Sequence, residues 1–557
     1  MDAYDKLYDL GGHHYPITTK SDLAQTWFNR GLLWTYGYNH EEAVACFEKA
    51  IEADPGCAMA HWGRAYAAGP NYNMPWHLFD DKNRAAALSV GHASSRAASE
   101  LTDGLTDWEL VLVKALPARY PQAEPIDDMS PWNDQFADAM REAFNANRDS
   151  LEVRTIFAES LLNRTPWKMW DLPSGRPAED ASTEEAQAVL EEAMDQDPAA
   201  MRHPGLLHLY VHLMEMSPFP QKALKAGDAL RTLVPDAGHL VHMPTHIDVL
   251  CGHYRDVVHW NQQAVRADLK YFDEKGAFNI YSGYRLHNYH FVIYGALFLG
   301  QIEPALAAVR GAAATVPDEM LRLESPPMAN YFESYLAMEP HILVRFGKWQ
   351  QATEMQLPDD QELHCTLTAN ILYARGVAHA ALGNVDAALA AEKEFLEAKA
   401  RVPKKRLLHN NRVIDLLDIA AEMLRGEILY RQQDYDAAFA ALRRSVELDD
   451  ALPYDEPWGW MQPSRHALGA LLLEQGYLEE AEATFRADLG LGGELSRASV
   501  HPDNVWSLKG LSDCLIAQGE TAELVQIAQR LELANARADR AVSASCFCAQ
   551  AALQAAE

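Results

Sequence analysis

The sequence predicts an all-α protein, a solenoid of antiparallel helical hairpins that is wound into a right-handed superhelix and interrupted by inserted loops. Three observations lead to this prediction. The segment from Ala24 to Gly56 places large, small and helix-breaking residues at the spacing of a helix–turn–helix unit of about 34 residues. Weaker versions of the same pattern recur along most of the chain. No stretch approaches the roughly 18 consecutive apolar residues that a membrane-spanning helix needs.

The first hairpin carries the clearest pattern. Its diagnostic positions are, in order, Trp27, Gly31, Ala43, Phe47, Ala50 and Pro55. The small residues let the two helices approach closely, and proline ends the second helix because it lacks an N–H donor. This pattern resembles the tetratricopeptide repeat (TPR), with one departure: Tyr38 stands where glycine is common. The resemblance implies a concave groove, which in typical TPR adaptors holds a peptide.

Later segments repeat the turn and the small residues of the first hairpin. They are His203–Pro235, Gly252–Ala264, Gly300 with Ala305 and Ala312, Gly347 with Ala352, Gly376 to Ala388, Gly426 to Ala438, Gly469 to Phe485, and Gly519. Since repeats stack on their neighbours, we expect one continuous TPR-like solenoid over residues 24–557, preceded by an N-terminal segment, residues 1–23. Insertions near residues 92–150, 164–183 and 271–285 interrupt it, and such insertions tend to form lids or binding loops.

Charge and cysteine usage narrow the class of protein. The 557 residues include 79 acidic and 48 basic side chains, a formal net charge of −31. Nucleic acid is therefore not an expected partner, because phosphate contacts need a basic stripe, and an acidic surface also repels anionic membranes. The first ten residues lack the basic and apolar regions of a signal peptide. The seven cysteines show no paired framework, so we expect reduced thiols and a cytoplasmic location. Metal ligation is the alternative role for Cys546 and Cys548, which are one residue apart.

Histidines recur at helical spacing in three successive segments. The pairs are His208 with His212, His242 with His246, and His287 with His290. Glu215 follows His212 by three residues, on the same helical face. Counting from repeat starts at Pro204, Gly238 and Leu286 places these side chains away from the core-facing line. The resemblance to the TPR family implies that this stripe lines the concave groove, so we expect the side chains on one solvent-facing wall of it. His341 would extend this wall.

Six imidazoles on one wall predict a transition-metal site. Neutral imidazole binds Zn, Cu, Fe or Ni, and a site dominated by histidine, without thiolates, favours copper or iron over zinc. The number of histidines suffices for a dinuclear centre. Glu215 would act as a ligand or as a general base beside a metal-bound water. The alternative is a polar groove that hydrogen-bonds an anionic or peptide ligand.

Aromatic and polar residues at other groove positions are candidates for contact with a substrate. They are Trp62, Tyr66, Trp167, Tyr294 and His341. Rings of this kind line small-molecule pockets and interfaces. Packing between neighbouring repeats is the structural alternative for each of them.

A wider resemblance covers nearly the whole chain. The segments Trp34–Ala43, His61–Gly63, Gly69–Asn73 and His239–His246 resemble a group of bacterial and fungal TPR proteins without settled activity. The residues themselves favour a metal-dependent enzyme, an oxygen-using oxidoreductase acting on a small organic substrate. A scaffold that binds a protein segment in the groove and a metal-dependent hydrolase are the alternatives. A protein partner or a homodimer is compatible with each.

Overall fold

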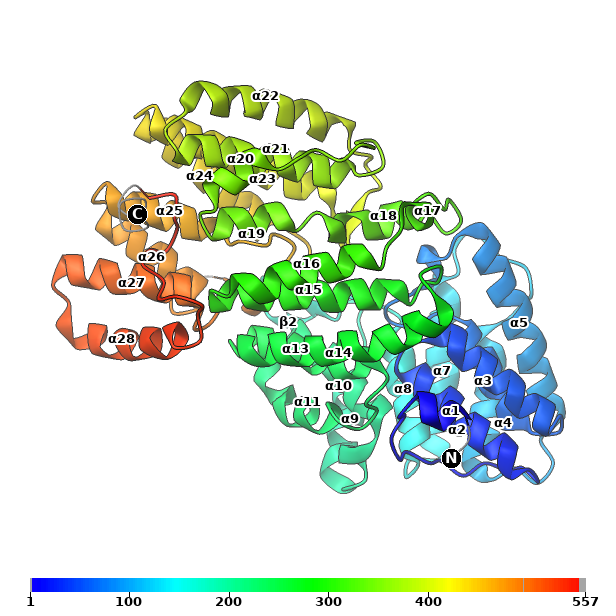
Figure 1. Cartoon of the computed structure of the whole chain (residues 1–557). Coiled ribbons are helices and arrows are strands. Elements are labelled where there is room, and N and C mark those ends of the chain that lie inside the picture. Colours follow the sequence, from blue (N-terminus) through cyan, green and yellow to red (C-terminus); the bar gives the residue numbers. More distant parts are fainter. Residues whose placement is uncertain (1–2, 494, 550–557) are drawn as a thin grey trace. The chain divides into compact units, whose positions relative to one another are not determined.

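The computed structural model describes residues 3–493 and 495–549, which form helices joined by short turns and loops (Figure 1). The predicted all-α, TPR-like hairpin fold is confirmed. Contacts between residues divide the chain into two compact units. Unit 1 comprises Met1–Ile247 and Gln263–Glu274, and unit 2 comprises Asp248–Gln262 and Lys275–Glu557.

Unit 1 contains the helices of the N-terminal half. They are α1 (Ala3–Leu7), α2 (Asp22–Tyr36), α3 (His40–Ala53), α4 (Ala58–Ala68), α5 (Asp81–Glu100), α6 (Asp107–Ala115), α7 (Ser130–Ala146), α8 (Leu151–Leu162), α9 (Thr183–Gln196), α10 (Pro204–Glu215), α11 (Leu224–Leu230) and α12 (Gly238–His242). Helices α13 (Pro244–Leu250) and α14 (Tyr254–Lys275) contribute residues to both units.

Unit 2 continues with longer helical pairs. Its helices are α15 (Ser282–Leu299), α16 (Ile302–Ala314), α17 (Asp318–Leu321), α18 (Met328–Phe332), α19 (Glu339–Arg345), α20 (Trp349–Glu354), α21 (Cys365–Ala381), α22 (Val385–Arg401), α23 (Val413–Arg431), α24 (Tyr435–Asp450), α25 (Ser464–Glu474), α26 (Leu478–Asp488), α27 (Val505–Gln518) and α28 (Thr521–Asn535). Figure 1 shows α21 and α22 side by side as an antiparallel hairpin, and α27 and α28 pair in the same way.

Close packing of large residues against glycine holds the first hairpin together. The ring of Phe47 on α3 lies against Gly31 on α2 and against Gly63 on α4. A Cβ atom at Gly31 would lie 2.8 Å from this ring, and one at Gly63 would lie 2.3 Å from it. Neither position has room for a side chain, so the large–small pattern read from the sequence corresponds to physical contact.

The segments expected to be insertions carry regular structure of their own. Residues 92–150 include the end of α5 and all of α6 and α7. Within residues 164–183, strand β1 (Trp170–Asp171) pairs antiparallel with β2 (Arg176–Pro177). In unit 2, β3 (Leu407–Leu408) pairs with β4 (Asn411–Arg412) in the same manner. Among the described residues, no helix combines the length and the apolar character needed to cross a membrane.

One expectation about the cysteines is wrong. Cys546 and Cys548 form a disulfide in unit 2, with their Cα atoms 5.2 Å apart, whereas both were expected to be reduced thiols. The thiols of Cys46, Cys57, Cys251, Cys365 and Cys514 are free. Two cysteines separated by one residue can bring their sulfur atoms together locally, so this disulfide does not require the framework of distant cysteine pairs that the sequence lacks.

Candidate metal centre

Helix α10 carries the first group of predicted ligands. Pro204 occupies the first helical turn, and Nδ1 of His203 caps the helix by accepting the N–H of Leu206 at 3.1 Å. His208, His212 and Glu215 then fall on one side of the helix, as their spacing predicts. Every residue of α10 is buried. The other residues of this helix are apolar or glycine, and a helix that is apolar on all sides belongs in an interior.

The second group of histidines lies on two short helices instead of one continuous helix. Pro244 starts α13 because proline cannot donate the hydrogen bond that would continue α12 past His242. At the start of α12, a Cβ atom on Gly238 would lie 2.0 Å from Oδ1 of Asp268. This close approach seats α12 against α14 and turns His239 toward α10.

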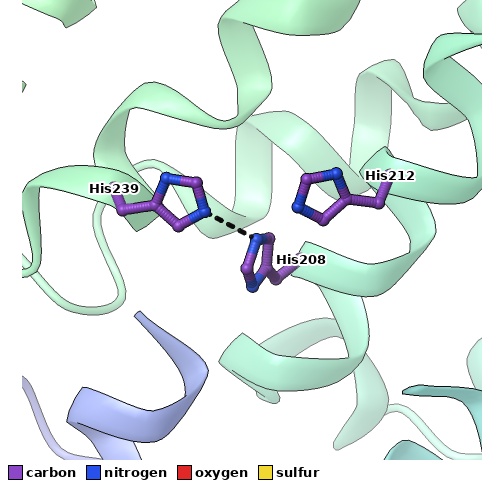
Figure 2. Close-up of side chains that lie close together, drawn as sticks. All are labelled: His208, His212 and His239. Atoms are coloured by element: carbon purple, nitrogen blue, oxygen red, sulfur yellow. Dashed lines mark hydrogen bonds between the residues drawn. The ribbon is translucent and has the colours of Figure 1, made fainter. Parts of the chain in front are cut away.

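Three imidazoles meet in the interior of unit 1. Figure 2 shows His208, His212 and His239 with ring nitrogens directed at a common space. The Nε2 atoms of His208 and His239 are 3.1 Å apart, and one ligand-capable nitrogen from each of the three rings lies within 4.8 Å of the other two. The side chains come from α10 and α12, which are separated in sequence by α11 and meet through His208 and His239. This histidine triad is therefore a candidate metal centre.

Glu215 joins the triad to the next histidine pair. Its Oε1 atom lies 3.0 Å from Nδ1 of His212, and its Oε2 atom lies 2.6 Å from Nδ1 of His246. Since a carboxylate accepts hydrogen bonds, each Nδ1 carries a proton, which leaves the Nε2 atoms of both rings as lone-pair donors. Nε2 of His246 faces Nε2 of His242 at 2.7 Å.

Two tyrosines cover the triad. Tyr38 has its ring centroid 4.5 Å from that of His208, and it stacks on His212 and His239 at interplanar angles of 18° and 25°. Tyr72, between α4 and α5, places its ring 4.5 Å from His212. Both tyrosines are buried, so the rings of the triad are enclosed by aromatic surface.

Burial affects the protonation of His208 and corrects the predicted orientation of the histidines. Burial lowers the pKa of His208 to about 3, with a small contribution from His242. The predicted metal ligands and Glu215 were expected on a solvent-facing groove wall, and this expectation is wrong: His208, His212, Glu215, His242, His246, His287 and His290 are all buried. In α10, the repeat phase distinguished the face of His208 and His212 from the core-facing line of Leu207 and Val211, but both faces are buried.

The predicted ligands are divided between the two units. His208, His212, His242 and His246 lie together in unit 1, whereas His287 and His290 belong to unit 2. In unit 2, the ring of His287 stacks on His409 with centroids 5.0 Å apart, and Nε2 of His290 lies 2.9 Å from Sδ of Met461. Burial lowers the pKa of His290 to about 3.

The predicted substrate-contacting residues are mostly buried. Trp62 stacks on Tyr66 with ring centroids 5.0 Å apart, and the Tyr66 hydroxyl donates to Glu159. In unit 2, the Tyr294 hydroxyl lies 2.9 Å from Nε2 of His501. His341, also in unit 2, has its ring edge against Trp460. These contacts are those of packed side chains.

The insertion of residues 164–183 packs beside the triad. The Nε1 atom of Trp170 donates to the carbonyl of Leu213 on α10 at 2.7 Å. The backbone N–H of the half-buried Trp167 donates to the hydroxyl of Tyr72, which in turn contacts His212. Trp167 thus lies one side chain away from the triad.

A third group in unit 1 is better explained as a helix cap. Oε1 of Glu152 lies 3.2 Å from Nε2 of His13 and 3.1 Å from Nε2 of His203. Burial by itself raises the pKa of Glu152, but the two histidines hold it well below its usual range. Since Nδ1 of His203 accepts the N–H of Leu206, its Nε2 carries the proton and lies beside the Glu152 carboxylate as an electrostatic pair. That tautomer has no lone pair for a metal.

Two members of the centre were not among the predicted site residues. His239 precedes His242 by three residues, and this spacing was a signal for a shared helical face. The signal for Tyr38 was its departure from the TPR consensus, where glycine is common. Its φ of 54° shows that the backbone keeps the left-handed conformation suited to glycine while carrying a tyrosine ring.

Comparison with known families agrees with the helical hairpins. A family model for the tetratricopeptide repeat matches residues 39–68 and 405–456. The chain thus contains tetratricopeptide repeats. The two matched segments include all of helices α3 and α4 and all of helices α23 and α24. No curated protein matches the chain.

Solved structures that are similar to this chain match it at low sequence identity and low TM-score. One is the APC/C hetero-tetramer Cut9–Hcn1, with 13% identity, a TM-score of 0.32, and coverage of 92% of this chain and 76% of that chain. Another is a monomeric mutant of IFIT1 with Gppp-AAAA, with 10% identity, a TM-score of 0.31, and coverage of 93% and 91%. A third is the P58(IPK) TPR domain, with 12% identity, a TM-score of 0.19, and coverage of 83% and 98%.

Proposed function

We propose that this TPR protein binds a transition-metal ion in unit 1, with His208, His212 and His239 as its ligands. The observation that carries the proposal is the convergence of three imidazole nitrogens within 4.8 Å of one another. Two nitrogens that bind one ion at about 2.0–2.1 Å in tetrahedral geometry lie about 3.3 Å apart. The Nε2 atoms of His208 and His239, at 3.1 Å, are close to that separation.

Glu215 supports the proposed centre from outside the ligand set. Both of its oxygen atoms accept hydrogen bonds from histidine Nδ1 atoms. Carboxylates in this position fix the tautomer and the ring orientation of metal-binding histidines. This gives Glu215 a positioning role in place of the ligand or general-base role that its spacing suggested. His242 and His246 offer a further pair of nitrogens for a second ion.

The donor set favours copper or iron chemistry. Neutral imidazoles suit these ions, whereas structural zinc sites are usually rich in thiolates and fully closed. Three protein ligands leave a coordination position open, as catalytic sites do. Dioxygen is small enough to reach a buried centre, so the activity we propose for the loaded protein is that of an oxygen-using oxidoreductase. A metal-dependent hydrolase would require access for a larger substrate beside the enclosing tyrosines.

A scaffold function is the second candidate, and the match to the TPR family favours it. TPR proteins typically hold a peptide in the concave groove. In that case the buried histidines would stabilise the packing of α10 against α12, and a partner would bind elsewhere on the surface.

Metal analysis of protein purified without a histidine tag separates the two candidates. We expect a stoichiometric transition metal after reconstitution with Cu²⁺, Fe²⁺ or Zn²⁺, and we expect loss of the metal in His208→Ala and His239→Ala. The matched control is His77→Ala, since His77 is exposed in unit 1. If the wild-type protein binds less than stoichiometric metal under every condition, the metal-binding proposal is contradicted and the scaffold function is the remaining candidate. Oxygen consumption by the metal-loaded protein, with His239→Ala as the control, tests the oxidoreductase.

A further inference from the structure

Unit 2 encloses a small cavity next to the only disulfide among the described residues. Its volume is about 20 Å³, which is room for a water molecule or a metal ion but not for an organic substrate. The charged residues, histidine and cysteines of its lining are Arg345, Glu427, His466, Cys546 and Cys548. The two cysteines come from the segment that follows α28, and Glu427 comes from α23.

Glu427 is held in the interior without a strong partner. Its Oε2 atom is buried and accepts no hydrogen bond within the described part of the chain, and the closest cation is Nη2 of Arg431 at 3.9 Å. Burial raises the pKa of Glu427. A buried carboxylate oxygen that lines a cavity and lacks a hydrogen bond costs stability unless a ligand satisfies it.

His466, the only histidine of the lining, is occupied by contacts within the protein. His466 receives a hydrogen bond from Arg345 at Nδ1, at 2.7 Å, and its Nε2 lies 2.9 Å from Oδ2 of Asp488. Both nitrogens of His466 are therefore engaged, and it has no free position for an ion. The potential ligand atoms that converge are a carboxylate oxygen of Glu427 and the sulfur atoms of Cys546 and Cys548, all within 4.8 Å of one another.

Two buried arginines lie where they can offset the negative charge of Glu427 and of the Cys546 and Cys548 thiolates that reduction of the disulfide would form. Arg345 donates from Nη2 to the carbonyl of Ser545 at 2.7 Å, and Arg431 donates to the carbonyl of Cys548. These hydrogen bonds hold both ends of the segment from Ser545 to Cys548 in place. Two thiolates and a carboxylate carry three negative charges, which a divalent cation and the nearby guanidinium groups counterbalance.

We propose that reduction of the Cys546–Cys548 disulfide creates a second metal site, in which both thiolates and Glu427 bind a divalent thiophilic ion such as Zn²⁺. An external dithiol supplies two electrons and two protons, so the S–S bond breaks, two thiols form and the dithiol becomes a disulfide. Binding of the ion then releases the two thiol protons. Cys546 is only partly buried, which gives the reductant access, whereas Cys548 is enclosed. In the reverse direction an external disulfide accepts two electrons from the two thiolates and, with two protons, becomes two thiols, so the Cys546–Cys548 bond re-forms and the ion is released.

Cobalt binding by the full-length chain tests this site directly. The chain is reduced with a water-soluble phosphine, freed of it without oxygen, and titrated with Co²⁺; thiol titration should count seven thiols in place of five. We expect a thiolate-to-cobalt charge-transfer band in the reduced chain and none in the oxidised chain. This band reports sulfur ligation, so it is independent of cobalt bound by the histidine triad, and either site can fail without the other.

Variants identify the ligands. Cys546→Ser and Cys548→Ser should each abolish the band, and Glu427→Gln should weaken cobalt binding at least about tenfold. Cys251→Ser is the matched control because Cys251 is a partly exposed free thiol of unit 2, and it should keep the full band. A disulfide that resists reduction in the native chain overturns the proposal, as does a reduced wild-type chain without the band. A band of equal strength in Cys546→Ser or in the oxidised wild type overturns it as well.

Discussion

The ring of Tyr38 lies nearly parallel to that of His212, with an interplanar angle of 18° and centroids 5.9 Å apart. Tyr38 reaches this position from the turn between α2 and α3, where its φ of 54° is a conformation that most side chains avoid. A strained residue of this kind costs about 1–3 kcal/mol and persists where its surroundings require it. Here the requirement is the cover over the histidine triad.

Replacing Tyr38 by Asn distinguishes the effect of the left-handed backbone conformation from the effect of the ring that covers the histidine triad. Asn tolerates the left-handed conformation, so the strain is relieved, but the buried ring is lost. Since loss of a buried aromatic ring costs about 3–5 kcal/mol, we expect net destabilisation of about 1–3 kcal/mol in urea unfolding and faster loss of bound metal. Tyr38→Phe should stay within about 1 kcal/mol of wild type and keep its metal. Tyr477→Asn, at a tyrosine that is 49% exposed, is the control. Wild-type behaviour of Tyr38→Asn in both assays would contradict the covering role.

Substituting Glu215 by Gln tests the positioning role of the carboxylate. An amide has one acceptor oxygen, so only one of His212 and His246 can still donate its Nδ1 proton to it. We expect metal affinity to fall about 10–100-fold in a competition titration, with the stoichiometry unchanged at high metal concentration. A Glu215→Gln protein that never reaches wild-type stoichiometry would instead identify Glu215 as a ligand. Glu184→Gln, at an exposed position of α9, should bind metal as wild type does.

The sequence contained enough information for the hairpins. The spacing of Gly31 and Phe47 predicted a close helix–helix contact, and in the structure the Phe47 ring leaves no room for a Cβ atom at Gly31. Local spacing also placed His208, His212 and Glu215 on one helical face. Both inferences depend only on contacts within a hairpin or a single helix, which the local sequence determines.

The partner of His208 required information that local spacing does not contain. Counting by repeats paired it with His242, whereas the structure pairs it with His239. Helix α12 is a single short element, ended by Pro244, and its rotation is set by the close approach of Gly238 to Asp268. A contact between residues thirty positions apart fixes this rotation, so the repeat phase alone was insufficient.

The burial of the histidines had a signal that the groove hypothesis overlooked. Between Pro204 and Met214, the two histidines of α10 are surrounded only by apolar residues and glycine. Such a helix has no polar face for solvent, so it predicts an interior position for its histidines as well. In α15, the residues that follow His290, Phe291 to Leu299, are likewise apolar or glycine, and His290 is also buried.

Burial of His212 leads to a prediction opposite to that of a solvent-facing wall. His212→Ala removes a fully buried ring and leaves Oε1 of Glu215 without its hydrogen bond at 3.0 Å. An unsatisfied buried acceptor costs about 1–3 kcal/mol, so we expect the free energy of unfolding to fall by at least that amount, together with loss of metal. His77→Ala, at an exposed position, should change the free energy of unfolding by less than about 0.5 kcal/mol. If His212→Ala unfolds at the same urea concentration as His77→Ala, the ring is not buried.

The pH dependence of stability should reflect His341 in unit 2. Burial lowers its pKa from 6.5 to about 4, so the unfolded chain takes up a proton below 6.5 while the folded chain does not. The contribution of His341 to stability is therefore complete above about pH 6.5 and is lost as the pH falls toward 4, by on the order of 3 kcal/mol. His341→Asn removes this proton uptake and keeps a polar group beside Asn370. Urea unfolding at about pH 7 and about pH 4.5 should show a smaller loss for His341→Asn than for wild type. The exposed variant His259→Asn should follow wild type, and equal losses for wild type and His341→Asn would rule out the buried, neutral state of His341.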